Sequence, residues 1–375
     1  MTSSYPTAER PIDAIFVKEH ARAAARHADV AILHLDRVDD SSLVPTPVRG
    51  TDPDFPTWRV AYRRRPEPVS YVANLVAAFR GYAQVRRAGF EPDVIHAHFF
   101  LTGVPAVVLG RLHRKPVVTT EHWSVFLPED PTSLGPALRR AARFAFERAD
   151  VVLPVSQALR AGIVATTGAK TRFLVVPNAV DEQLFSFAPR DGREDGVRKI
   201  VGVGDIYDVK GWDLLLDAVA ELSPRRHDFR IQIVGEGPLE AAYRRRAEEL
   251  GVDNVVTFLG FRPKQEVASI VRDADLLVLP SRYDNSPCVI GEALSAGVPV
   301  VGTSVGGVPE LVSEANGFLA RPHDPASIAG QLERALDHLD RFDRLAISRA
   351  AHARFGLDAI GRTLAQVYDE VTRRP

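Results

Sequence analysis

The chain has 375 residues, 45% of them hydrophobic, and this length favours two domains, each with its own buried core. The formal net charge of −1 excludes the overall basic footprint of a nucleic-acid-binding protein. The single cysteine, Cys288, excludes an internal disulfide framework and fits a reducing compartment such as the cytoplasm. No apolar run approaches the ~20 residues that a transmembrane helix needs.

The N-terminal half is predicted to alternate helices and strands. Ser3 to Pro6 are typical of the end of a first strand, yet almost nothing precedes them; a truncated strand or a start codon placed too late would each explain this. Residues 43–68 contain six prolines and are predicted to form a surface excursion with an edge segment at 58–62. Hydrophobic periodicity predicts helices over 16–27, 70–88, 104–112 and 136–148, and strands over 30–35, 94–96 and 117–120.

The C-terminal half repeats this plan after a predicted linker at 189–197, which has no apolar period. Residues 149–156 closely match residues 274–281, and each segment ends in a serine that can cap the next helix. We therefore predict an α/β protein with two doubly wound domains, each a parallel sheet with helices on both faces. The expected strands are 199–203, 231–234, 255–259, 276–279 and 298–301, and the expected helices are 212–222, 239–250 and 263–273, with a mostly helical tail over 325–371.

The stretch after the buried strand at 276–279 is predicted to contain an anion site. Ser286 is the expected N-cap of a helix, with Pro287 at its first position. The helix start from Ser286 to Cys288 offers unpaired backbone N–H groups and a partial positive charge. A glycine pair at 306–307 would let the backbone approach a ligand closely, and phosphate is the expected ligand.

Two acidic residues accompany this helix start. Asp284 lies just before the helix and Glu292 in its second turn, with seven residues between them. Carboxylates in these positions can hold the hydroxyl groups of a sugar or ribose beside a diphosphate. The pair alone is weak support, because many solvated helices show two acids at such a spacing.

Residues 281–301, together with 306–310 (GGVPE) and 316–319 (NGFL), resemble the donor-binding half of family 4 glycosyltransferases, which have the GT-B architecture. The resemblance implies two Rossmann-like domains that face each other across a cleft, and a C-terminal helix that crosses back to the first domain. The implied boundaries are an acceptor-binding domain over 1–188, a linker over 189–197, a donor-binding domain over 198–354 and the helix over 355–375.

The family resemblance also assigns the donor site. Glu292 matches the second of two family glutamates, and Asp284 stands at the first as a shorter acid. Lys210 matches the lysine that clamps the donor diphosphate, with a helix-start surface lysine as the alternative. Asp205 replaces the family's arginine, for which Arg282 is either a substitute or simply an exposed loop residue. The other donor-binding residues that the resemblance implies are Gly204, Gly235, Arg262, Asn285, Ser286, Pro287 and Cys288, with simple packing as the alternative for Arg262 and Cys288.

Histidines mark the predicted first domain. His122 matches the family histidine that lies against the donor sugar, and the alternative is a strand-end histidine with local hydrogen bonds. His96 and His98 alternate as metal ligands can, but no acidic or cysteine partner stands at zinc-type spacing, so we expect structural or pocket-lining roles and no metal. Asp13 and Ala14 occupy the place of the family's glycine-rich acceptor turn.

The resemblance implies a retaining hexosyltransferase that uses a UDP- or GDP-sugar and a saccharide or lipid-linked saccharide acceptor, as in polysaccharide biosynthesis, without a cofactor. The expected catalytic residues are Lys210 for the leaving diphosphate, Glu292 for the ribose, and Asp284 and His122 for the sugar hydroxyls. A sugar-nucleotide epimerase and a non-catalytic nucleotide-sugar-binding protein are the alternatives.

Charge is distributed unevenly along the chain. Residues 59–172 contain seventeen Lys/Arg against eight Asp/Glu. This excess is either a solvated basic surface or a peripheral contact with the anionic inner membrane face or an anionic acceptor.

Overall fold

The computed structural model describes residues 1–7, 11–39, 46–50, 52–63, 69–189 and 196–373. The chain forms two compact units: unit 1 consists of Met1–Ala179 and Leu357–Pro375, and unit 2 of Val180–Gly356. Residues 180–188, which the sequence analysis placed in the first domain, belong to unit 2. Val180 donates its N–H to the Phe355 carbonyl at 2.8 Å, and Phe185 is buried in the core of unit 2. Most of the predicted linker lies outside the described residues.

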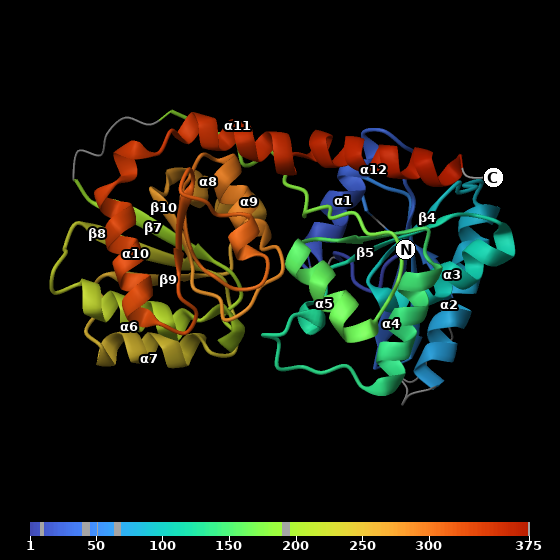
Figure 1. The fold of residues 1–375 in the computed structure, drawn as a ribbon, viewed down its shortest axis with the longest axis horizontal. Helices are drawn as coiled ribbons and strands as arrows, with labels where there is room; N and C mark the ends of the chain where they lie inside the picture. Colours follow the sequence, from blue (N-terminus) through green and yellow to red (C-terminus); the bar gives the residue numbers. More distant parts are fainter. Residues whose placement is uncertain (8–10, 40–45, 51, 64–68, 190–195, 374–375) are drawn as a thin grey trace. The chain divides into compact units, whose positions relative to one another are not determined.

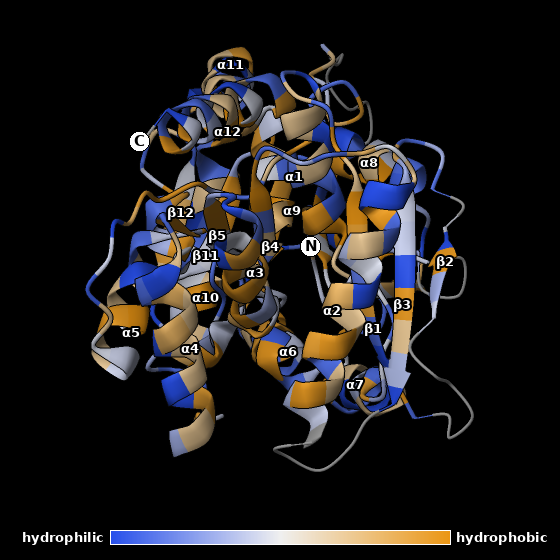
Figure 2. Ribbon diagram, turned by 90° about the vertical axis from the view of Figure 1, so that its right-hand side faces the viewer, coloured by the Kyte–Doolittle hydropathy of each residue, from blue (hydrophilic) through white to orange (hydrophobic). Residues whose placement is uncertain are grey.

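Unit 1 combines helices with short, mostly parallel strands. Its strands are β1 (Ile32–Val38), β2 (Pro47–Arg49), β3 (Thr57–Arg63), β4 (Ile95–His98), β5 (Val117–Glu121) and β6 (Val151–Pro154). Its helices are α1 (Ile15–Ala25), α2 (Val69–Arg87), α3 (Phe100–His113), the short η1 (Ser124–Phe126), α4 (Pro136–Arg148), α5 (Gln157–Thr167) and α12 (Leu357–Thr372). The buried α3 is drawn mainly in hydrophobic colours, whereas the amphipathic α4 alternates between hydrophobic and hydrophilic colours (Figure 2).

The strands of unit 1 form two hydrogen-bonded groups, in the orders β1-β3-β2 and β4-β5-β6. All neighbours are parallel except β2, which runs antiparallel to β3. The segment at 58–62, which was expected at an edge, lies within β3 at the centre of its group. The edge is instead formed by β2, from the proline-rich excursion.

Thr2 links the two groups of strands. Its N–H donates to the Leu33 carbonyl at 3.0 Å, its carbonyl accepts from Leu35 at 2.8 Å, and the Met1 carbonyl accepts from His98 at 2.9 Å. The first strand is therefore reduced to isolated bridges between Thr2 and its two neighbours, β1 and β4. A cavity of about 890 Å³ continues from this point and is lined by Met1 and by the segments that lead into β1 and β4.

Helix α12 packs along α1 in unit 1 (Figure 1), as expected for the C-terminal helix. Leu364, Val367 and Ala23 share one buried cluster. Gly361 permits the close approach of the two helices, because a Cβ at this position would lie only 2.3 Å from the Ala23 carbonyl oxygen.

Unit 2 contains a six-stranded parallel sheet. Its strands are β7 (Arg198–Val203), β8 (Phe229–Val234), β9 (Val256–Gly260), β10 (Leu276–Leu279), β11 (Val300–Thr303) and β12 (Gly317–Ala320). Its helices are α6 (Trp212–Leu222), α7 (Glu240–Glu249), α8 (Lys264–Asp273), α9 (Cys288–Ser295), α10 (Pro325–Asp337) and α11 (Arg344–Phe355), with short 3₁₀ turns η2 (Asp208–Lys210), η3 (Val308–Glu310) and η4 (Leu339–Arg341).

The strand order of this sheet is β12-β11-β10-β7-β8-β9, and all neighbours are parallel. Counted from β7, this is the order 3-2-1-4-5-6 of a Rossmann sheet. The chain moves from β7 to one edge, returns, and continues from β10 to the other edge. Ligands of such sheets bind at the carboxyl ends of the strands where the direction reverses, which here means β7 and β10.

Several predicted boundaries in unit 2 are wrong by one or two residues, including the starts of α9 and β11. Helix α9 begins at Cys288 with Pro287, in an extended conformation, as its N-cap residue, so Ser286 lies one position too early. Strand β11 begins at Val300 rather than 298; proline has no N–H to donate, and the Pro299 carbonyl accepts from Leu277 before the strand begins.

The two matching segments end differently. Ser156 caps α5 as predicted, since its side chain accepts the Leu159 N–H at 3.0 Å. Ser281 does not cap a helix, because α9 begins seven residues later.

Candidate functional site

The glycine turns after β7 and β8 lie against each other at the carboxyl edge of the unit 2 sheet. Gly204 donates its N–H to the Val234 carbonyl at 2.9 Å, and Gly235 donates to the Gly260 carbonyl at 3.1 Å. Gly235 has φ +146°, and a Cβ there would lie 2.0 Å from the Gly204 carbonyl oxygen. No other residue fits this turn without backbone movement, so both predicted glycines shape the floor of the candidate site.

Lys210 lies where the loops after β7 and β10 meet. Its Nζ donates to the Asp284 Oδ2 at 2.7 Å, and the Arg282 N–H donates to the Val209 carbonyl at 2.8 Å. The Asp284 carbonyl in turn accepts the Gly307 N–H at 3.0 Å, which adds the loop after β11. Lys210, Asp284 and the glycine pair, which the sequence analysis assigned separately, are thus brought together.

Electrostatics keep Lys210 positively charged. Burial alone would lower its pKa, but the charge and hydrogen bond of Asp284, with smaller contributions from Asp205 and Cys288, raise it above the usual lysine value. The ammonium group therefore presents a fixed cation at the reversal point of the sheet. A diphosphate is an anion that such a cation can neutralise.

The segment before α9 completes this group. Asn285 and Ser286 are buried, Pro287 forms the N-cap, and Cys288 opens the helix. The first N–H groups of a helix carry a partial positive charge and suit an anion. Glu292 is half-buried and lies four residues after Cys288, hence on the same face of α9.

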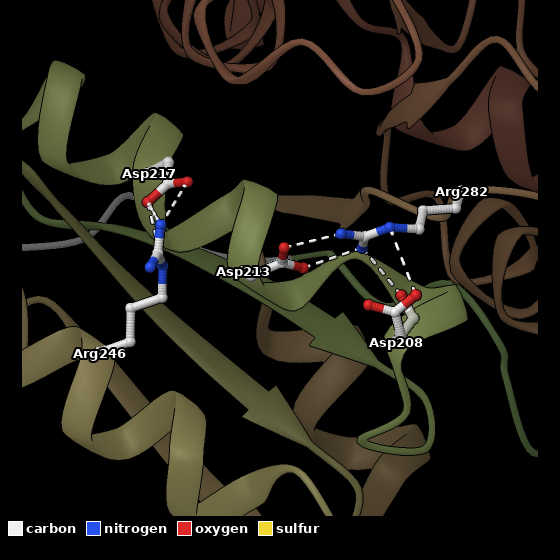
Figure 3. A network of polar contacts seen from close by, with 5 residues as sticks. All are labelled: Asp208, Asp213, Asp217, Arg246 and Arg282. Carbon is white, nitrogen blue, oxygen red and sulfur yellow. Dashed lines mark hydrogen bonds and ion pairs between the residues drawn. The ribbon is translucent and has the colours of Figure 1, made fainter.

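Arg282, the possible substitute for the family's arginine, is bound to two acidic residues within unit 2. Its guanidinium donates to both carboxylate oxygens of Asp213 at 2.9 and 2.7 Å and to the Asp208 carbonyl at 2.9 Å (Figure 3). These contacts already neutralise its charge at the start of α6. Asp205 is exposed, and its carbonyl accepts the indole N–H of Trp212 at 3.1 Å.

Arg262 follows β9, the outermost strand on this side of the sheet. It donates to the Phe261 carbonyl at 2.9 Å and lies 3.6 Å from Glu266. Because β9 pairs with β8, Arg262 stands at the same carboxyl edge as Gly235.

His122 belongs to unit 1, where it is half-buried and lies in a cluster of histidines. Its Nε2 is 3.0 Å from Nδ1 of His98, and the two rings are stacked with centroids 5.3 Å apart. His20, from α1, places Nε2 3.0 Å from the Pro177 carbonyl oxygen. His96 is held by the Tyr368 hydroxyl and the Thr120 hydroxyl, each at 2.7 Å.

Burial keeps these imidazoles neutral. It lowers the pKa of His96, His98 and His122 well below the usual histidine value, and that of His20 to about 4. Neutral imidazoles have one lone pair available on a ring nitrogen. His20, His98 and His122 each have a ring nitrogen that lies within 4.8 Å of the other two. The prediction of no metal rests on the spacing of His96 and His98, whereas this group joins His98 and His122 to His20 of α1.

Glu121 supports His122 and was also overlooked. Its fully buried carboxylate accepts backbone N–H groups of Phe100 at 2.8 Å and of His122 and Trp123 at 2.9 Å. Burial raises the pKa of Glu121 to about 7, although the three hydrogen bonds oppose this rise. The sequence contains one indication of this role, because an acidic residue stands directly between the predicted strand at 117–120 and His122.

The turn before α1 keeps a left-handed conformation without glycine. Ala14 has φ 48° and ψ 40° at the N-cap of α1. This position coincides with the acceptor turn that the family builds from glycine. The Cβ of Ala14 limits how closely a ligand can approach this backbone.

Both halves of the chain match families of known proteins. Residues 14–184 match the family described as Glycosyltransferase Family 4, and residues 197–338 match the description Glycosyl transferases group 1. The D-inositol 3-phosphate glycosyltransferase of Corynebacterium efficiens is 34% identical over 326 residues, which cover 80% of this chain and 77% of that protein.

Solved structures share the fold. Sucrose-phosphate synthase from Thermosynechococcus elongatus superposes with a TM-score of 0.75 at 21% identity, over 95% of this chain and 92% of that one. Anabaena Alr3699/HepE in complex with UDP-glucose gives a TM-score of 0.70 at 21% identity, over 95% of both chains.

The Rossmann sheet of unit 2, the parallel strands of unit 1 and these similarities define a glycosyltransferase with the GT-B fold. The chain belongs to glycosyltransferase family 4. Among the residues that the structure describes, no helix is both long and apolar enough to span a membrane.

Proposed function

We propose that the protein transfers a hexose from a UDP- or GDP-sugar to a saccharide or lipid-linked saccharide, with retention of configuration and without a metal or other cofactor. The observation that carries this proposal is the Lys210–Asp284 pair at the reversal point of the unit 2 sheet, 2.7 Å apart and beside the start of α9. A UDP-sugar is favoured because HepE, which shares the fold, binds UDP-glucose.

The hard step of this reaction is the departure of a nucleoside diphosphate. Lys210 and the first N–H groups of α9 would stabilise the negative charge that develops on the leaving oxygen. Glu292 would accept hydrogen bonds from the ribose hydroxyls. Asp284, which Lys210 holds in place, would accept one from the transferred sugar. Asn285, Ser286 and Cys288 would position the diphosphate through the same segment.

Retention follows if the acceptor attacks from the face that the diphosphate leaves. The acceptor oxygen then forms the new bond to the anomeric carbon as the bond to the diphosphate oxygen breaks. The acceptor proton passes to that departing oxygen. Isolation of a covalent glycosyl-enzyme intermediate would contradict this route.

The donor site is tested by thermal unfolding with UDP-, GDP- and ADP-sugars, on wild type and Glu292→Ala in parallel. A ligand at about 100 times its dissociation constant stabilises the protein by roughly 2.7 kcal/mol. We expect one nucleotide class to raise Tm of the wild type and of the control Glu314→Ala, whose carboxylate is exposed, but not of Glu292→Ala. No shift with any nucleotide sugar would reject the donor site.

Product analysis separates transfer from the two alternatives. Transfer predicts an acceptor-dependent release of nucleoside diphosphate, which His122→Ala should lower while donor binding to unit 2 persists. An isomerised donor formed without acceptor would identify an epimerase. Donor binding without turnover, across a panel of saccharide and lipid-linked acceptors, would identify a binding protein.

A lipid-linked acceptor would bring the protein to an anionic membrane face. The outer side of α4 supports this part of the proposal, because Arg139, Arg140 and Arg148 are exposed there beside Phe144, which is 37% exposed. Basic and aromatic side chains on one helix face suit an anionic lipid surface.

Vesicle sedimentation tests this contact. The protein should sediment with phosphatidylglycerol vesicles more than with phosphatidylcholine vesicles, and less so at high salt. Arg139→Glu/Arg140→Glu should abolish the difference. Arg245→Glu/Arg349→Glu, which changes two exposed arginines of unit 2, should leave it intact.

A further inference from the structure

Three imidazoles in unit 1 converge from different elements. His20 comes from α1, His98 from the end of β4, and His122 from the residue after β5. One ring nitrogen of each lies within 4.8 Å of the other two. His20 and His98 are buried and His122 is half-buried, and among the described residues no carboxylate or thiol joins this group of nitrogens.

The orientation of His20 is fixed by the fold. Its Nε2 lies 3.0 Å from the Pro177 carbonyl oxygen, which can only accept, so this nitrogen carries the proton. Nδ1 therefore presents its lone pair, and it is buried without a hydrogen-bond partner. A buried acceptor without a hydrogen bond costs free energy, and a bound ligand would offset this cost. Histidines that bind metals are commonly held in this way, by a carbonyl on the other ring nitrogen.

His98 and His122 offer the two other nitrogens. Nδ1 of His98 and Nε2 of His122 are 3.0 Å apart. Two nitrogens bound to one tetrahedral zinc ion, at 2.0–2.1 Å each, are separated by about 3.4 Å. Metal binding therefore requires the two nitrogens to move slightly apart and the two rings to turn, so that both lone pairs point to the ion. The ring that now donates the hydrogen bond between His98 and His122 would carry its proton on its other nitrogen instead. Both rings would therefore stay neutral.

We propose that His20, His98 and His122 form a site for a divalent transition-metal ion, with zinc as the expected occupant. Three neutral imidazoles suit zinc, cobalt and nickel, whereas magnesium and calcium require oxygen ligands. His96 is not a ligand, because both its ring nitrogens are hydrogen-bonded to Tyr368 and Thr120.

The cavity beside Met1 provides an entry path. His20 and His98 both line this cavity of about 890 Å³, so an ion and a water molecule as fourth ligand can reach the site. Metal binding does not depend on the proposed transfer reaction. Only a further effect, inhibition of transfer by the metal, rests on the proposed function, because a metal-bound His122 cannot also contact a donor sugar.

Cobalt titration of the chelator-treated protein tests the site directly. We expect one equivalent of Co²⁺ to give the intense visible absorption of four-coordinate cobalt, and Zn²⁺ to displace it. Zinc should also raise Tm by about 2 °C or more, which a ligand well above its dissociation constant achieves in a unit of this size. Full-length protein is used throughout.

The discriminating variant is His20→Gln. Glutamine can still donate an N–H to the Pro177 carbonyl, but it has no basic ring nitrogen, and its neutral amide oxygen is a weak ligand for zinc and cobalt. Cobalt affinity should fall by more than about 10-fold, the loss already seen when supporting residues of metal sites are removed. His113→Gln, which changes a histidine outside the cluster, should keep wild-type affinity.

Two outcomes would overturn the proposal. One is a six-coordinate cobalt spectrum that is the same in wild type and His20→Gln; the other is loss of binding in His113→Gln, which would place the metal on the surface. Should His20→Gln fail to fold, as circular dichroism would reveal, His98→Gln provides the same test. His122→Ala removes a proposed ligand, so it should lower cobalt affinity as His20→Gln does, and intact cobalt binding in this variant would also contradict the three-histidine site.

Discussion

Arg282 illustrates at the residue scale how a charge close to the candidate site is committed to the fold. Its guanidinium forms a two-pronged ion pair with Asp213 in the first turn of α6 (Figure 3). Burial would raise the pKa of Asp213, but the hydrogen bonds and charge of Arg282 outweigh it, so the net shift is downward. The pair therefore stabilises unit 2 only while Asp213 is ionised.

This pair predicts an acid-dependent loss of stability. A carboxyl whose folded pKa is lowered stabilises above its unfolded pKa of about 3.9, and the stabilisation disappears as the pH falls through the lower, folded value. Asp213→Asn should cost about 1 kcal/mol at pH 7, and the difference from wild type should shrink below about pH 4. Urea unfolding of both proteins at several pH values measures this difference in the free energy of unfolding.

The matched control is Glu314→Gln. Glu314 is exposed and lies 3.8 Å from Arg334, so its removal should change little at any pH. A constant difference between wild type and Asp213→Asn from pH 7 to pH 3 would contradict the assigned ion pair.

Sequence reasoning identified some site residues far better than others. Lys210, Asp284 and Gly235 were predicted because they stand in a recognisable family pattern, and the structure brings all three to one edge of the sheet. His20 and Glu121 were missed. Their roles depend on which side chains meet after folding, and α1 alone shows only that His20 lies on its buried face.

At the element scale, the loop between β7 and α6 depends on a close backbone approach to β10. Gly211 has φ +66°, and a Cβ there would lie 2.2 Å from the Pro280 carbonyl oxygen. Pro280 directly follows β10, and Lys210 directly precedes Gly211. The same contact thus packs the loop and positions the cation.

Gly211→Ala is therefore expected to destabilise unit 2 by about 3 kcal/mol or more, and to weaken donor binding. Gly251→Ala provides a control, because Gly251 has nearly the same φ, +67°, with nothing within 4 Å of its Cβ position. Gly251→Ala should lower the free energy of unfolding only by the cost of a left-handed alanine, about 1–2 kcal/mol. Equal losses in denaturant unfolding would show that the approach to Pro280 contributes nothing.

Fully buried strands and helices with clear periodicity were the most predictable elements. Strand β10, helix α4 and helix α6 begin and end as predicted, since apolar runs and flanking prolines or glycines define them locally. Strand β3 was correctly located but placed at an edge. Its central position depends on pairing with β2, which no local pattern indicates.

At the scale of the whole chain, the two groups of strands in unit 1 meet at a short junction. Among the described residues, only Thr2 bridges β1 and β4, and the cavity extends from there between the segments that lead into both strands. The Met1 amino group points to the His96 carbonyl at 2.6 Å, and burial lowers its pKa to about 5. Burying this group costs free energy that an uncharged peptide N–H in the same place would not.

An apolar extension of about six residues ahead of Met1 should therefore stabilise unit 1. It can pair with β1 and β4 in parallel register, fill the cavity and convert the amino group into an amide. We expect Tm to rise by about 4 °C or more in thermal unfolding. A glycine-serine extension of equal length should give little change, because it buries no apolar side chains. The apolar extension with a central proline should lose most of the gain, since proline cannot donate a strand hydrogen bond. Equal Tm values for all three extended chains would show that the cavity does not accept a strand.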